Sequence, residues 1–228
     1  VAVTAASLIK DRNEQILKNF ELGTLARNQL SDYLNASKQS MDILDTNLTR
    51  ASNLIADFKE VAVLKEDERR VVFDLESEIT NALNNIQPES EKEHFKIEID
   101  CIANTKVYQD PEILTRILIN LYTNSIKHGF EGKQDGMIKI KVSLTRDIVH
   151  LSYQDNGVGL PQSAIKKIFE PFYTTKRGHG GTGLGMHIVF NLVTQSLDGE
   201  IKYDSSCKTG AKFDIVFSNN LANQPRGL

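Results

Sequence analysis

The sequence predicts an α+β protein in which an N-terminal helical hairpin is followed by a sandwich of helices and a sheet. Residues 1–87 contain one of the fourteen glycines and no proline, whereas residues 88–228 contain the other thirteen glycines and all five prolines. Apolar residues recur with a helical period in the first part and alternate with polar residues in much of the second. We therefore expect a helical domain at residues 1–66 and a mixed domain at residues 67–228.

The composition narrows the class of protein. A net charge of −3 argues against a nucleic-acid partner, because there is no excess of Lys and Arg to contact phosphates. Cys101 and Cys207 lie far apart and outside any CxxC pair, which indicates neither a disulfide framework nor a zinc site. No apolar run approaches the ~20 residues that cross a bilayer. The chain opens at Val1 without a methionine, so we expect a cytoplasmic piece of a longer protein, attached to a membrane only through regions preceding it.

Two helices are expected in the first part, separated at Gly23-Thr24. The first is the weaker and carries apolar residues at Ala5, Ile9, Ile16 and Phe20. In the second, apolar residues recur in alternating steps of three and four after Met41: Leu34, Met41, Leu44, Leu48, Ala51, Ile55 and Phe58. This pattern is typical of a helix that buries one narrow stripe against partner helices. It favours a dimer with a four-helix bundle, and the alternative is a monomeric hairpin packed on the second domain.

The second part predicts alternating strands and helices. Strands are expected at 71–75, 95–102, 137–145, 148–154, 200–205 and 211–217. Helices are expected at 76–86, 110–128, 161–169 and 184–197. Only Arg146-Asp147 separates two of the strands, which indicates a hairpin, and we expect the last two strands to form another pair. Because the helices need one face of a sheet to cover, the pattern favours an α+β sandwich.

The helix at 110–128 has the clearest beginning, with a capping acceptor at Asp110, a first-turn proline at Pro111 and an acid at Glu112. Helical spacing places four polar side chains on one face: Asn120, Asn124, Lys127 and His128. Amide oxygens are hard ligands that suit Mg²⁺, and Lys127 could meet the charge of a phosphate. The same face could instead be a polar stripe in solvent.

The segment "DNGVGL" at 155–160 follows directly on a predicted strand. A carboxylate at Asp155 could accept a hydrogen bond from the exocyclic amine of adenine, while the glycines admit the flat ring. Guanine carries a carbonyl oxygen at that position and would be disfavoured. An ordinary Asp-Asn-Gly turn is the alternative.

The segment "TTKRGHGGTGLGMH" at 174–187 combines five glycines with Lys176 and Arg177. Exposed backbone N–H groups beside positive charge suit phosphate, although a mobile surface loop is the alternative. A dinucleotide-binding fingerprint would need a strand immediately before the glycines, and a P-loop would need GxxxxGK[ST]; neither occurs. We expect a lid over about 161–183 that ends at the helix beginning near 184, with Phe169 and Phe172 as its apolar anchor or as plain core residues.

Taken in order, the polar helix face, "DNGVG", "IFEPFYTTK", "GTGLGM" and "KTGAKF" resemble the sequence boxes of the ATP-binding domain of sensor histidine kinases. This domain belongs to the GHKL group, which includes gyrase-type topoisomerases, mismatch-repair ATPases and a heat-shock chaperone. The resemblance covers roughly residues 68–218, and the helical first part is similar to the kinases' dimerisation hairpin. It implies a GHKL-type sandwich with a mixed, mainly antiparallel sheet, and ATP and Mg²⁺ as cofactors.

The resemblance also implies roles for individual residues. Asn124, helped by Asn120, would hold Mg²⁺, and Lys127 and His128 would lie near the phosphates. Asp155 would bind the adenine amine, with Gly157 and Gly159 beneath the base. The remaining ATP-binding residues implied by the resemblance are Thr175, Lys176, Arg177, Gly181, Thr182, Gly183, Leu184, Gly185 and Met186.

The sequence departs from the family pattern at two points. Ala211 follows Gly210 where the family usually has Thr or Ser, which removes one hydroxyl group near the base. The family's phosphoryl-accepting histidine lies early in the first helix, but all five histidines here lie in the second part: His94, His128, His150, His179 and His187. We expect no catalytic residue within this chain and an acceptor histidine upstream of Val1. His94, His150 and His187 are expected to be packed rather than to bind a metal.

The resemblance implies a phosphotransferase that moves the γ-phosphoryl group of ATP to a histidine, for relay to an aspartate on a response-regulator receiver domain. The implied assembly is a homodimer formed through the hairpin. Two alternatives stand beside this reading. One is a degenerate regulatory module that binds ATP without kinase activity, and the other is a DNA-handling ATPase of the same fold group, which the negative net charge disfavours.

Overall fold

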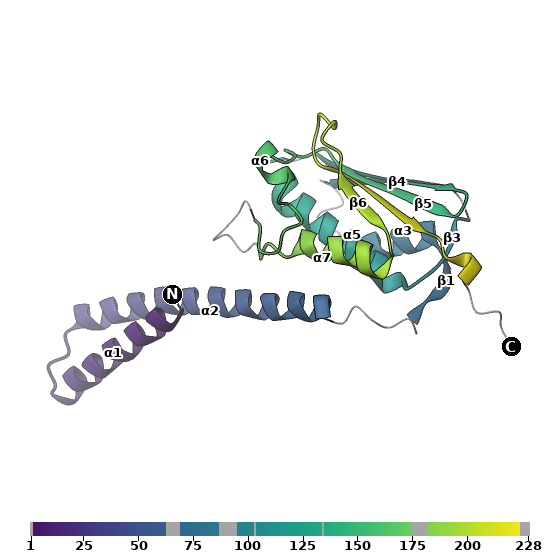
Figure 1. Ribbon diagram of the computed structural model, residues 1–228. Coiled ribbons are helices and arrows are strands. Elements are labelled where there is room, and N and C mark those ends of the chain that lie inside the picture. The colour runs from purple at the N-terminus through teal and green to yellow at the C-terminus, as the bar shows by residue number, and fades with distance from the viewer. Residues whose placement is uncertain are drawn as a thin grey trace. The chain divides into compact units, whose positions relative to one another are not determined.

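The structure is a computed structural model that describes residues 2–62, 69–86, 95–102, 104–133, 135–174 and 182–223. It divides into two compact units, Val1–Ala56 and Asp57–Leu228, which are taken in turn below (Figure 1). Among the described residues, no helix is both long enough and apolar enough to cross a membrane.

The first unit is a helical hairpin. Helix α1 spans Ala2–Glu21 and helix α2 spans Arg27–Ala62, so the break expected at Gly23-Thr24 is present. Gly23 has a φ of 65°, and the Thr24 amide donates to the Asn19 carbonyl at 2.9 Å, which ends α1. The two helices are joined by a hydrogen bond from the Tyr33 hydroxyl to Asn13 Oδ1 at 3.1 Å.

The apolar stripe of α2 is uncovered in the single chain. Four residues spaced seven apart are 57–66 % exposed: Leu34, Met41, Leu48 and Ile55. Leu44 is half-buried and Ala51 is exposed, and the side chain of Phe58 lies outside the described part. A repeat of seven keeps these residues along one line of the helix, so the hairpin presents a continuous apolar seam to solvent.

The second unit is built on a five-stranded sheet with the strand order β2-β4-β5-β7-β6. Its strands are β2 (Phe95–Cys101), β4 (Gly136–Thr145), β5 (Ile148–Asp155), β6 (Glu200–Tyr203) and β7 (Lys212–Ser218). The β2–β4 pair is parallel and the other three pairs are antiparallel. The expected mixed, mainly antiparallel sheet is therefore confirmed, as are the hairpin at Arg146-Asp147 and the β6–β7 pair.

Helices cover one face of this sheet (Figure 1). They are α3 (Leu75–Ile86), α5 (Pro111–Asn124) and α7 (Gly185–Asn191). The strands alternate buried and exposed side chains, and their buried residues meet the apolar face of α5, which consists of Leu114, Ile117, Leu118 and Leu121. The opposite face is polar and carries cross-strand ion pairs such as Lys139–Glu98 at 3.0 Å. This arrangement confirms the α+β sandwich.

Helix α5 and strand β1 begin where the sequence predicted them, at Pro111 and Val71. The Asp110 side chain accepts from the Glu112 amide at 2.9 Å, and Pro111 is the first residue of α5. The strand expected at 71–75 ends one residue earlier, as β1 (Val71–Asp74), because Asp74 Oδ1 accepts from the Ser77 amide at 2.9 Å and so caps α3. Strand β1 pairs with β3 (Lys106–Gln109), a short strand that the sequence did not predict.

Three predicted helices differ from the structure in extent or type. The helix expected at 161–169 is shortened to α6 (Gln162–Ile165), followed by turns in which the Lys167 amide bonds to the Ala164 carbonyl. The helices expected at 110–128 and 184–197 each finish in a π-helical turn, η2 (Ser125–Gly129) and η3 (Leu192–Ser196). A π turn adds one residue to the helical repeat, so side chains beyond it no longer follow α-helical spacing.

Candidate functional site

The Asp155 carboxylate is the most heavily bonded side chain of the candidate site. It lies at the end of β5 and is buried. Its Oδ1 accepts from the Gly157 amide and from the Ala211 amide, each at 2.9 Å. Its Oδ2 accepts from the Ser125 hydroxyl at 2.7 Å. Three segments that are far apart in the sequence therefore converge on one carboxylate.

The backbone around Asp155 is too close to admit side chains at three glycines. A Cβ at Gly157 would lie 2.5 Å from the Gly129 carbonyl oxygen. Gly210 has a φ of 75°, and a Cβ there would collide with the Asp155 carbonyl oxygen. Gly159 lies nearby, where a side chain would meet the carbonyl of Gly210. The glycines of "DNGVG" and "KTGAKF" thus allow the two loops to meet at Asp155.

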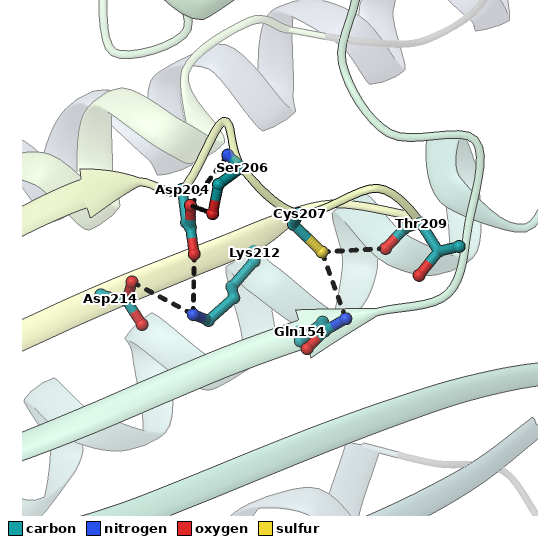
Figure 2. Close-up of polar contacts among 7 residues, drawn as sticks. All are labelled: Gln154, Asp204, Ser206, Cys207, Thr209, Lys212 and Asp214. Carbon is teal, nitrogen blue, oxygen red and sulfur yellow. Dashed lines mark hydrogen bonds and ion pairs between the residues drawn. The ribbon is translucent and has the colours of Figure 1, made fainter.

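The loop before Gly210 is tied to the sheet by polar contacts, which Figure 2 shows. Asp204 Oδ1 accepts from the amide and the hydroxyl of Ser206, at 2.9 and 2.6 Å. Lys212 Nζ lies 2.8 Å from Asp204 Oδ2 and 3.6 Å from Asp214. The hydrogen bond from Lys212, followed by those from Ser206, lowers the pKa of Asp204 to about 2. The sequence analysis did not find this cluster, because its contacts depend on the β6–β7 register.

Cys207 attaches the same loop to strand β5 (Figure 2). Its Sγ accepts from Gln154 Nε2 at 3.2 Å and donates to the Thr209 carbonyl at 3.1 Å. Gln154 directly precedes Asp155, so the contact holds the loop beside the end of β5. The neighbouring Ala211 contributes its backbone amide to Asp155, and this contact does not need the hydroxyl that the family usually carries there.

The two asparagines of α5 converge on the beginning of α7. A Cβ at Gly185 would lie 3.0 Å from Asn120 Oδ1 and 3.7 Å from Asn124 Nδ2. Asn120 Nδ2 donates to the Arg116 carbonyl at 3.0 Å, which directs its oxygen toward α7. Asn124 Nδ2 is buried and has no hydrogen-bond partner among the described residues. A buried amide without a partner is costly, which makes this position a candidate contact for a ligand.

Lys127 and His128 lie in the π turn η2 rather than in a continuous α-helix. The Phe130 amide donates to the Ser125 carbonyl at 2.8 Å, a bond that spans five residues. In this turn Ser125 and Gly129 face Asp155, while Lys127 is exposed and His128 is half-buried. The α-helical spacing that placed Lys127 and His128 on the face of Asn120 therefore does not apply beyond Asn124.

The start of α7 is described from Thr182 onward. Thr182 Oγ1 accepts from the Leu184 amide at 3.3 Å, and both Leu184 and Met186 are buried. A side chain at Gly183 would meet the backbone of Phe172 and Tyr173. The other predicted phosphate-binding residues, Thr175, Lys176, Arg177 and Gly181, lie outside the described residues.

The segment before the glycine run is held against α7 by His187. Its Nδ1 lies 3.0 Å from the Phe169 carbonyl, and since a carbonyl only accepts, Nδ1 carries the proton of that bond. Nε2 then accepts from Asn191 Nδ2 at 3.2 Å. The Phe169 ring also packs on Phe190, with centroids 5.5 Å apart. Phe172 is 57 % exposed, so of the two proposed aromatic anchors only Phe169 is packed.

Comparison with known proteins places this arrangement in a family. Residues 109–220 match the family described as histidine kinase-, DNA gyrase B-, and HSP90-like ATPases. The chain is 28 % identical over 207 residues to sporulation kinase B of Bacillus subtilis, covering 91 % of this chain and 45 % of that protein. It is 35 % identical over 123 residues to the sensor histidine kinase ZraS of Escherichia coli O157:H7, covering 54 % of this chain and 26 % of that protein. The chain thus spans less than half the length of these two relatives.

Solved structures give the same result. The nucleotide-free catalytic domain of the histidine kinase ThkA has a TM-score of 0.58 and 25 % identity, and the match covers 66 % of this chain and 95 % of that one. ThkA in complex with the response regulator protein TrrA shares the fold, with a TM-score of 0.61 and 21 % identity over 96 % of this chain and 58 % of that one. Residues 109–220 thus match the histidine kinase-, DNA gyrase B-, and HSP90-like ATPases, and the proteins that the chain resembles over a wider range include sporulation kinases and sensor histidine kinases.

Proposed function

We infer that residues 67–228 bind ATP with its adenine amine on Asp155 and transfer the γ-phosphoryl group to a histidine. The observation that carries this proposal is the buried Asp155 carboxylate, which is fixed by three donors at the end of β5. Gly157 and Gly159 would lie beneath the base. A carboxylate at this place accepts from the amine of adenine and repels the carbonyl oxygen of guanine.

The carboxamides of Asn124 and Asn120 are the proposed Mg²⁺ ligands. They fit this role because they are oxygen-bearing neutral groups that converge beside Gly185. The Nδ2 of Asn124, buried and without a partner among the described residues, is a donor and would suit a phosphate oxygen beside the metal. Bound Mg²⁺ would neutralise charge on the phosphates during transfer. In this arrangement Asn120 and Asn124 orient the metal, and Gly185 leaves room for the phosphates beside them.

The remaining site residues are proposed to surround the triphosphate. Lys127 and His128 would lie near the phosphates on one side. The segment on the other side consists of Thr175, Lys176, Arg177 and the run Gly181, Thr182, Gly183, Leu184, Gly185 and Met186. Positive charge and backbone N–H groups suit the negative charge that spreads over the phosphoryl oxygens in the transition state.

The acceptor and the partners follow from the same proposal. Residues 1–93 contain no histidine, so the hairpin of this chain does not supply the acceptor. The relay would pass to a response regulator, since ThkA forms a complex with one. The exposed seam of α2, from Leu34 to Ile55, supports a homodimer through the hairpin. We place this part of the protein in the cytoplasm, where ATP is available.

Two measurements test the proposal. In calorimetric titrations the chain should bind ATP in the presence of Mg²⁺ and bind GTP much more weakly. With γ-labelled ATP, the chain should label a histidine-bearing helical hairpin of a related kinase added in trans, and its own five histidines should stay unlabelled. Tight ATP binding without any transfer would instead identify a regulatory module. Label on His94, His128, His150, His179 or His187 would refute the placement of the acceptor.

A further inference from the structure

A chain of hydrogen bonds lies behind the Asp155 carboxylate. Ser125 Oγ is 2.7 Å from Asp155 Oδ2 and 3.0 Å from the Tyr153 hydroxyl oxygen. The exposed fractions of Ser125, Tyr153 and Asp155 are 2, 1 and 4 %. Each of these buried polar groups therefore has a partner in the chain.

The protons of this chain can point in only one direction. An ionised carboxylate accepts and does not donate, so the single hydroxyl proton of Ser125 is donated to Asp155. The proton between Tyr153 and Ser125 then comes from Tyr153. Burial raises the pKa of Tyr153, so its hydroxyl keeps that proton. The order of donation is Tyr153 to Ser125 to Asp155.

The same contacts determine how much hydrogen-bonding capacity Asp155 has left. A carboxylate offers about two acceptor positions on each oxygen. The amides of Gly157 and Ala211 occupy both positions on Oδ1, and Ser125 occupies one on Oδ2. A side chain at Gly129 would crowd Oδ2, with its Cβ at 3.3 Å. One acceptor position on Oδ2 remains for a ligand.

We propose that Ser125 and Tyr153 are positioning residues that hold Asp155 with one open acceptor and thereby set selectivity for a 6-aminopurine. The inference rests on the proposed function of Asp155. One open acceptor matches one amine proton. Without the Ser125 hydroxyl, Oδ2 has a second open position and space for a water molecule. Such a water can donate to Asp155 with one proton and to the guanine carbonyl with the other, which relieves the repulsion of guanine.

The test compares ADP and GDP affinities by calorimetric titration of the full 228-residue chain. Ser125→Ala should weaken ADP binding about tenfold and leave GDP binding unchanged or tighter, so that the ratio of the two falls by at least about tenfold. Ser125→Thr keeps the hydroxyl and should restore the ratio. Tyr153→Phe should shift the ratio in the same direction by about threefold, because Ser125 still donates but is no longer held.

Ser196→Ala is the matched control. Ser196 is also buried and also lies in a π turn, but its hydroxyl has no hydrogen-bond partner among the described residues. It should keep wild-type affinity for both nucleotides. If Ser125→Ala weakens ADP and GDP equally, or changes neither, the inference is overturned. If the wild-type chain does not prefer ADP to GDP, the assignment of Asp155 to the base fails as well, and this result appears before any variant is made. If Ser125→Ala does not fold, Tyr153→Phe and Ser125→Thr decide the question.

Discussion

Replacing Asp155 by asparagine changes one oxygen of the site into an amide nitrogen, and the contacts determine which one. Both partners of Oδ1 are backbone N–H donors, so the oxygen of the new carboxamide must stay on that side. The NH₂ group therefore takes the place of Oδ2, facing the Ser125 hydroxyl and the expected adenine amine. Two donors then face each other at the base. Ser125 must also turn from donor to acceptor toward residue 155, and its own proton then needs another acceptor, for which the Tyr153 oxygen is in reach.

The expected cost to ADP binding is about 2 kcal/mol, within the roughly 1–3 kcal/mol of a buried polar group left unmet. This corresponds to an increase in Kd of about thirtyfold. GDP should gain affinity, because its carbonyl oxygen now meets a donor. Calorimetric titration with both nucleotides measures the change, and thermal unfolding without nucleotide separates it from a loss of fold. An Asp155→Asn chain that binds ADP with wild-type affinity and remains folded would refute the assignment of Asp155 to the base.

Three further predictions concern other parts of the molecule. Asn124→Ala should largely remove the effect of Mg²⁺ on ATP affinity while changing the affinity for adenosine little. If calorimetric titration shows the wild-type effect of Mg²⁺, Asn124 is not a metal ligand. Leu48→Lys should yield monomers in light scattering, whereas Thr49→Lys, an exposed change off the seam, should not; monomeric wild-type protein would contradict the bundle. Lys212→Met should raise the pKa of Asp204 from about 2 toward its ordinary value of 3.8 in a carboxyl NMR titration. Since this pKa is lowered by folding, the stabilisation is present above about pH 3.8 and is lost as the pH falls toward 2. It should be smaller in the variant, in which only the hydrogen bonds from Ser206 still lower the pKa of Asp204.

The parts of the fold that were predictable are those fixed by neighbours in the sequence. Asp110 and Pro111 mark the beginning of α5 because capping involves only the next two residues. The strands β4 and β5 were predictable because alternation repeats every two residues and the turn at Arg146-Asp147 is short. The four-residue strand β3 was missed, since it contains too few residues to show a period and forms only by pairing with β1.

The candidate site was predictable as a set of residue types but not as a set of contacts. A carboxylate at a strand end followed by glycines pointed to Asp155, and the structure adds what holds it. Ser125 was not singled out, because its contact with Asp155 spans thirty positions and depends on a π turn that α-helical spacing does not indicate. The cluster of Asp204 and Lys212 was missed for a similar reason, since it requires the fold-back of β7 on β6.

If Asp155 binds the base as proposed, the way it is held would couple base recognition to folding in this domain. Its partners come from η2, from the turn after β5 and from Ala211, which directly precedes β7, so the carboxylate is in place only when the helix layer and two strands are packed together. The proposed phosphate contacts do not depend on the packing around Asp155. Gly183 lies against the backbone of Phe172 and Tyr173, and the His187–Phe169 hydrogen bond holds that segment on α7. Loss of that bond would release the phosphate side and leave Asp155 untouched. Substituting His187 by alanine should therefore weaken ATP more than adenosine, whereas the Ser125 variant should weaken both to a similar degree.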